Sequence, residues 1–151
     1  MKASKLLLKL QEEAELYKEL VKAPNNNDNS INSVMSRYNY VNFQEILQVA
    51  FRGEDEDIPE KRIEDLGMRI DHYFSIHAPD DEDFRGFVKL ISTYLVFIAK
   101  KPLHPQGTVF EDGSRVYRGD DSYICTGKTK FLEYELSLCR YCVCKSHASN
   151  G

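Results

Sequence analysis

The chain has 151 residues, of which 42% are hydrophobic and 29% are charged, and its mean hydropathy is −0.49. This length and composition are typical of one water-soluble domain and argue against a protein embedded in a membrane. The formal net charge of −4 gives no general attraction to phosphate backbones, so we expect no nucleic-acid partner.

The first ten residues do not have the pattern of a secretory signal. A basic start is followed by three leucines, and Lys9 then interrupts the apolar run, whereas a signal needs about seven continuous apolar residues. We therefore expect a cytoplasmic protein whose cysteines stay reduced.

We expect a single, mainly α domain: a multi-helix bundle at 1–101, a cysteine-rich β/α metal-binding segment with a small β-hairpin at 102–146, and a flexible tail at 147–151.

Apolar residues spaced three and four apart predict several helices in the first hundred residues. The first is expected over residues 4–23, because the turn formers at 24–30 compete with helical hydrogen bonding. A second is expected behind a cap by Asn29 or Ser30, and a third behind a cap by Asn42.

Two further helices are expected after two acidic runs, residues 54–57 and 80–83. We interpret both runs as solvated turns that favour the N-terminus of the helix that follows. Neither run has the alternating oxygen ligands around a glycine that a calcium loop needs. The fourth helix is expected to end near His77. The fifth, after Pro79, contains the run 94–99, which is apolar nearly all round and predicts a central helix covered by neighbours.

The character of the chain changes at residues 100–105, where two prolines forbid a continuing helix. Runs rich in β-forming residues then flank Asp112-Gly113, and this dipeptide between such runs is a strong hairpin signal. Residues 122–125 are expected to add a short strand, and residues 131–139 to form one or two helical turns.

All four cysteines lie in this last part of the chain, at Cys125, Cys139, Cys142 and Cys144, in the pattern C-x13-C-x2-C-x-C. Thiolates are the ligands that zinc and iron–sulfur clusters favour, and each commonly takes four of them. The segregation into one segment therefore predicts a metal or cluster site. A disulfide or redox pair and unconnected buried thiols remain alternatives.

The spacing does not decide between zinc and an iron–sulfur cluster. Structural zinc sites usually draw on two C-x2-4-C knuckles, whereas one arm here offers Cys125 alone. The trio is not the bacterial ferredoxin C-x2-C-x2-C either. His104, in the proline-flanked loop, is a candidate further metal ligand or a donor to one. Basic residues surround the cysteines and would favour thiolates, or simply form a solubilising rim: Lys128, Lys130, Arg140 and Lys145.

No catalytic constellation stands out from the sequence. The stretch 126–129 ends like a phosphate-binding loop but lacks the earlier glycine at the required spacing. A hydrolase built around His104 would have to recruit nearby carboxylates, and nothing in the sequence defines their geometry. These carboxylates are Glu111, Asp112, Asp120 and Asp121. Whether the chain is an enzyme stays open, with no catalytic residue assigned.

Residues 100–105 (KKPLHP) and 137–144 (SLCRYCVC) resemble an archaeal family, found chiefly in methanogens, that is classified as a domain of unknown function. The resemblance covers about residues 52–145. It implies a cytoplasmic archaeal protein, and the anaerobic, cluster-rich metabolism of such cells favours iron–sulfur over zinc somewhat. It brings no activity and no catalytic residues.

Two hypotheses follow. In the first, the protein is not an enzyme: four thiolates hold a structural zinc ion or cluster that fixes the C-terminal segment onto the helices, where it could present a surface to a protein partner. In the second, the protein is a redox or sensor protein that uses an iron–sulfur cluster or the pair Cys142 and Cys144. The oligomeric state is not predicted.

Overall fold

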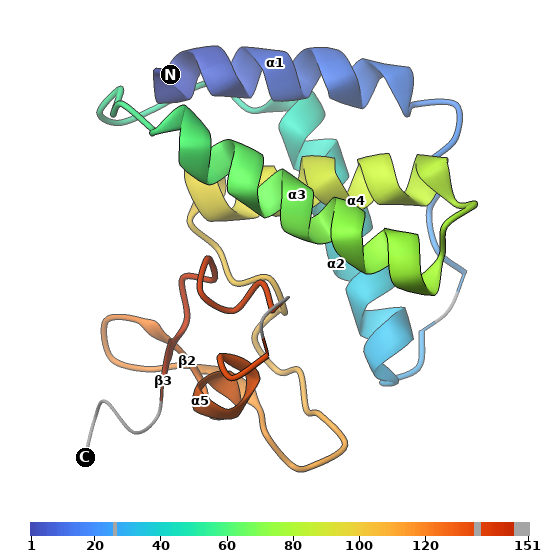
Figure 1. Cartoon of the computed structure of the whole chain (residues 1–151), viewed down its shortest axis with the longest axis vertical. Coiled ribbons are helices and arrows are strands. Elements are labelled where there is room, and N and C mark those ends of the chain that lie inside the picture. Colours follow the sequence, from blue (N-terminus) through green and yellow to red (C-terminus); the bar gives the residue numbers. More distant parts are fainter. Residues whose placement is uncertain (26, 135–136, 147–151) are drawn as a thin grey trace.

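The long helices lie in the first hundred residues, and a small sheet with a short helix follows them. The computed structural model describes residues 1–25, 27–134 and 137–146. Figure 1 shows the helices together as one body, with the sheet and a short helix at one end of it. The helical body (residues 3–99) contains α1 (Ala3–Leu16), α2 (Ile31–Gln48), α3 (Glu60–His77), α4 (Glu82–Thr93) and the π-helix η1 (Tyr94–Ala99). The C-terminal segment (residues 102–146) contains β1 (Val116–Arg118), β2 (Tyr123–Cys125), α5 (Lys128–Phe131) and β3 (Lys145–Ser146). The mainly α prediction is confirmed.

The first acidic run serves a different helix from the one predicted. Asp55 accepts hydrogen bonds from the backbone N–H of Ser4 at 2.9 Å and from its hydroxyl at 2.7 Å, so the run satisfies the start of α1, not that of α3. Helix α1 also ends at Leu16, earlier than predicted. The N–H of Tyr17 bonds back to Ala14 and closes the last turn, while the ring of Tyr17 lies 6.1 Å from that of Phe87.

Helix α2 is continuous, where the sequence predicted two helices. Ser30 caps it as expected, accepting the N–H of Ser33 at 3.3 Å. Asn42, predicted as a second cap, lies inside the helix and is fully buried. Its amide donates to the carbonyl of Tyr38 at 2.8 Å and its oxygen accepts from Lys101 at 3.3 Å. The prediction was wrong because a distant lysine satisfies the side chain, which a pattern of neighbours cannot reveal.

The fifth predicted helix is observed, with a change of winding in its apolar half. Asp81 caps α4 by accepting the N–H of Phe84 at 3.2 Å. Residues 94–99 form the π-helix η1, and Leu95 within it is 1% exposed, as expected of a central helix. The π-helix ends at Ala99, and the C-cap residue Lys100 has a left-handed φ of 55°. Within the described residues, no helix is both long and apolar enough to cross a membrane.

The predicted hairpin around Asp112-Gly113 is reduced to a tight turn closed by a single bridge, Val109 with Arg115. Gly113 has a φ of 88°, which explains the need for glycine there. The longer strand pairing follows this turn in the chain: β1 pairs antiparallel with β2, and β3 pairs in parallel with β2. The predicted third strand is therefore β2. The helical turn expected over 131–139 lies earlier, as α5; residues 135–136 and the predicted tail fall outside the described residues.

Candidate metal centre

The four cysteines reach one cavity from different parts of the C-terminal segment. Cys125 ends β2, Cys139 lies in a turn, and Cys142 and Cys144 lead into β3. Because β3 pairs in parallel with β2, the end of the chain returns beside Cys125. All four line a cavity of about 790 Å³ between the helical body and the C-terminal segment. Cys125 and Cys144 are buried, and the other two are half-buried.

Backbone N–H groups point at two of the sulfur atoms. The N–H of Leu103 donates to Sγ of Cys142 at 3.5 Å. The N–H groups of Gly127 and Lys128 donate to the sulfur of Cys125. Burial raises the pKa of Cys125, and these two donors oppose the rise because they favour the thiolate. N–H donors to sulfur stabilise thiolates, which are the form that binds metals.

Cys142 and Cys144 interact directly. The thiol of Cys144 donates a hydrogen bond to the sulfur of Cys142, which lowers the pKa of Cys142 and raises that of Cys144. Burial raises the pKa of Cys139. The ammonium group of Lys128 donates to the carbonyls of Cys142 at 2.9 Å and Cys144 at 2.5 Å. Its positive charge opposes the rise in the pKa of Cys139 and Cys144 and adds to the lowering of the pKa of Cys142.

The sulfurs are close enough to influence one another without forming a closed coordination shell. The pKa of Cys125 is raised by Cys139 and Cys142, and that of Cys144 by Cys125. Across residues 1–25, 27–134 and 137–146, no group of three or more His, Cys, Asp or Glu side chains has an arrangement that could hold a metal ion. The structure thus brings the predicted cysteines to one cavity, but not to coordinating positions.

His104 lines the same cavity. Its half-buried ring meets that of Phe110 edge to face at 4.9 Å, and Phe110 meets Phe131 at 5.5 Å. Burial lowers the pKa of His104, so the ring is held neutral, the form that binds metals. The observed contacts of His104 are aromatic packing.

Tyr141, in the middle of the cysteine trio, fastens the segment to α3. Its hydroxyl donates to the carboxylate of Asp65, which lowers the pKa of Asp65. The guanidinium groups of Arg62 and Arg69 lie 5.6 Å and 6.0 Å from the centre of its ring. Sequence reasoning missed this contact. A signal was available, because Arg62, Asp65 and Arg69 are three and four residues apart and so share one face of a helix.

Other candidate residues from the sequence analysis make contacts that stabilise turns and strand pairing. Lys130 pairs with Asp112 at 3.0 Å. Asp112 accepts the N–H of Ser114 at 2.9 Å, and these contacts lower its pKa to about 2, which suits a turn residue rather than a proton carrier. In the stretch that ends like a phosphate loop, Thr126 accepts the N–H of Arg115 at 2.8 Å and so extends the strand pairing.

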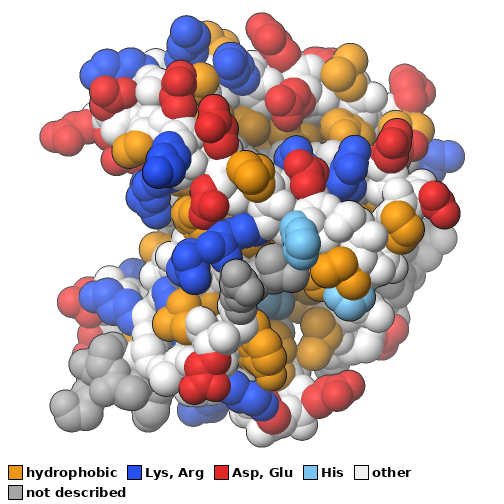
Figure 2. Space-filling model, viewed as in Figure 1, with side chains coloured by type: hydrophobic (Ala, Val, Ile, Leu, Met, Phe, Trp, Pro, Cys, Tyr) orange, Lys and Arg blue, Asp and Glu red, His pale blue; other side chains and the backbone are white. Residues whose placement is uncertain are grey.

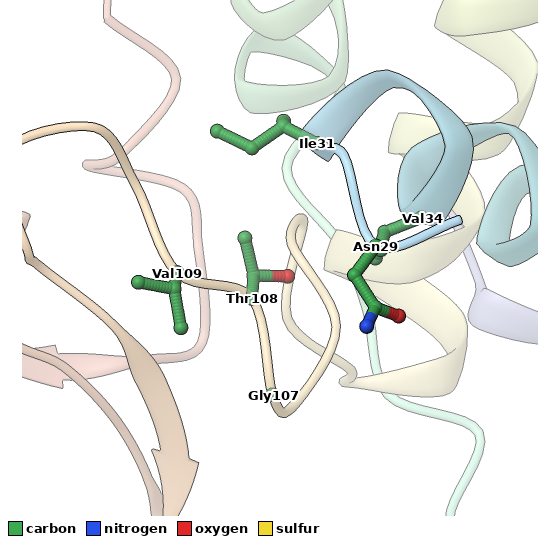
Figure 3. Close-up of a pocket in the computed structure, with 6 residues that line it drawn as sticks. All are labelled: Asn29, Ile31, Val34, Gly107, Thr108 and Val109. Carbon is green, nitrogen blue, oxygen red and sulfur yellow. The ribbon is translucent and has the colours of Figure 1, made fainter.

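A second cavity, of about 370 Å³, lies between the start of α2 and residues 107–109 (Figure 3). Figure 3 shows Thr108 on the 107–109 loop beside the start of α2, and its hydroxyl donates to the carbonyl of Pro105 at 2.7 Å. The described residues that line this cavity carry no ionisable side chain, so they offer no acid or base. They are Asn29, Ile31, Val34, Gly107, Thr108 and Val109.

Comparison with known proteins confirms the resemblance to an archaeal family. Residues 7–147 match the model of a family described as "Uncharacterized protein conserved in archaea (DUF2115)". The UPF0305 protein MJ0646 of Methanocaldococcus jannaschii is 37% identical over 113 residues, which are 74% of this chain and 68% of that protein. The UPF0305 protein MmarC6_0221 of Methanococcus maripaludis is 37% identical over 92 residues, 61% of this chain and 56% of the relative. A UPF0305 protein of Methanothermobacter thermautotrophicus is 28% identical over 95 residues, 59% and 58% of the two chains. The chain thus spans under two thirds of the last two relatives. No solved structure gives a significant match.

Proposed function

We propose that this chain, which belongs to the archaeal family DUF2115, binds one soft metal centre through Cys125, Cys139, Cys142 and Cys144. The centre is a zinc ion or an iron–sulfur cluster, its role is structural, and its compartment is the reducing cytoplasm. The observation that carries the proposal is that four cysteines, separated along the C-terminal segment, all line one cavity.

The surroundings of the sulfurs support thiolate ligands. Four thiolates around Zn²⁺ leave a net charge of about −2, which a partly buried site must offset. The ammonium group of Lys128 and the N–H groups aimed at Cys125 and Cys142 are placed to do so. Metal binding would draw the sulfurs inward from their observed positions, and this movement requires the loops around Cys139 and Cys142 to shift.

His104 is needed as a ligand only where one thiol stays outside the shell, since zinc sites and clusters commonly take four protein ligands. Its neutral ring lines the same cavity and is the available substitute. A His104→Gln variant that keeps full metal content would assign His104 to packing.

The test begins with oxygen-free purification, elemental analysis and an absorption spectrum. We expect either about one zinc per chain and no visible colour, or iron with acid-labile sulfide and a visible charge-transfer band. Cys125→Ser and Cys142→Ser should each weaken metal binding at least about tenfold in a chelator competition. Val143→Ala, in the same loop and 38% exposed, is the matched control and should keep the metal.

Two results would remove the proposal. One is a reduced, cooperatively folded chain that neither retains nor takes up zinc or iron above the level of the double variant lacking Cys125 and Cys142. The other is a Cys125→Ser variant that binds as tightly as the natural chain, because Cys125 is the ligand that must come from a separate strand.

The direct contact between Cys142 and Cys144 favours a second candidate, a dithiol redox pair. Its oxidation would join the two sulfurs in a disulfide and pass two electrons and two protons to a small disulfide such as oxidised glutathione, which leaves as two thiols. Titration of free thiols before and after this oxidant, on metal-free protein, should show the loss of two thiols per chain. Unchanged thiol content would exclude the redox pair.

A further inference from the structure

The cavity that holds the cysteines is much larger than a metal site requires. Its volume is about 790 Å³, within the roughly 300–1,000 Å³ that small-molecule pockets occupy. Helices α2, α3, α4 and η1 form one side of it, and residues 103–144 form the other. Figure 2 shows this face hollowed between the helical body and the C-terminal segment, with hydrophobic side chains gathered around the hollow.

Both sides of the cavity are apolar and rich in aromatic rings. The helical side presents Phe74 and Val88, and the opposite side presents Phe110 and Phe131. The rings of Phe110 and Phe131 already meet edge to face at 5.5 Å, the arrangement that aromatic groups prefer. Thiols behave as small apolar groups in such a wall while they are protonated.

The cations in the wall already have hydrogen-bond acceptors. Arg69 pairs with Asp65 at 3.0 Å, and Lys128 donates to the carbonyls of Cys142 and Cys144. A strongly charged ligand would therefore have to displace these contacts. An apolar ligand would not, and it would supply the contact atoms that apolar walls lack when they enclose open space.

We propose that this cavity binds an apolar small molecule with an aromatic or conjugated ring, held between the helical body and the cysteines. The size of the cavity and its walls on two sides favour a compact molecule over a segment of another protein. The site adds a ligand class to the protein and does not depend on the proposed metal centre, because the apolar walls exist without it.

The test uses Nile red, a neutral apolar dye whose emission shifts to the blue in apolar surroundings, titrated against the full chain. We expect saturable, blue-shifted emission with one dye per chain. Val88→Phe and Met35→Trp should fill the cavity from two different helices and weaken binding at least about fivefold. Val41→Phe is the control, because Val41 is 61% exposed on α2 and does not line the cavity.

The dye must bind the natural chain saturably, or the proposal fails whatever the variants do. It also fails if both filling variants bind like the natural chain, or if Val41→Phe weakens binding equally. Thermal unfolding checks each variant, and the use of two helices keeps the test decisive if one variant misfolds. Metal content is measured on the same samples. Dye binding by protein that neither retains nor takes up metal would count against the metal centre alone, and metal without dye binding would count against the cavity alone.

Discussion

Leu95 lies at the centre of the helical body, and its truncation should show how much of the stability depends on η1. The side chain is 1% exposed. Leu95→Ala removes three carbon groups, which at ~0.8 kcal/mol each costs about 2.4 kcal/mol of transfer free energy. A void adds to this cost, but Leu95 also lines the large cavity, so part of the new space merges with space that already exists. We expect a loss of about 3 kcal/mol in the free energy of unfolding, or roughly 6 to 12 °C in Tm for a chain of this length.

Urea unfolding followed by circular dichroism measures this loss as a shift in the midpoint at constant slope. Leu8→Ala is the matched control: Leu8 is 61% exposed on α1, so we expect a change within about 0.5 kcal/mol. If Leu95→Ala cost less than about 1 kcal/mol, or Leu8→Ala cost as much as Leu95→Ala, then η1 would not be the central helix.

Three further predictions concern the cap of α4, the contact of Tyr141 with α3 and the half-buried imidazole of His104. Asp81→Ala should cost about 1 kcal/mol, measured by thermal unfolding, because the N–H of Phe84 loses its acceptor. Tyr141→Phe should leave the helices intact but speed amide exchange in residues 137–144, because the hydrogen bond to Asp65 is lost; unchanged exchange would contradict this. Burial lowers the pKa of His104 below 6.5, so the unfolded chain protonates first and the free energy of unfolding should fall as the pH drops through 6.5 and on through the lower folded pKa. His104→Gln should show a shallower fall in urea titrations over that range.

Sequence patterns predicted best the helices whose signals come from residues close together along the chain. The three- and four-residue spacing that ends near His77 and the acidic run 80–83 before the fifth helix both depend on neighbours along the chain, and both helices are observed. The mistakes involve partners far away. Asn42 was taken for a cap although Lys101 satisfies it, and Asp55 was assigned to the following helix although it accepts the N–H of Ser4 in the first turn of α1.

For the candidate site, too, the sequence predicted the grouping of the cysteines but not the contacts that depend on distant partners. The segregation of four cysteines predicted that they would lie together, and they share a cavity. The hydrogen bonds of Lys128 to two carbonyls and the contact of Tyr141 with α3 depend on how the C-terminal segment docks on the helices. No spacing within the sequence expresses that docking, since it is set by the parallel return of β3 and the position of α3.

The C-terminal segment has little hydrophobic core of its own, so a bound metal would add stability that its apolar contacts do not supply. Its three strands contain three, three and two residues, too few for independent stability. Its own cluster of buried side chains consists of Val116, Cys125 and Cys144, so two of the three are thiols. Burial of so few apolar groups offsets only a small part of the entropy lost when the segment is ordered. The proposed thiolate–metal bonds would act in this same cluster and would tie β2 to the residues just before β3.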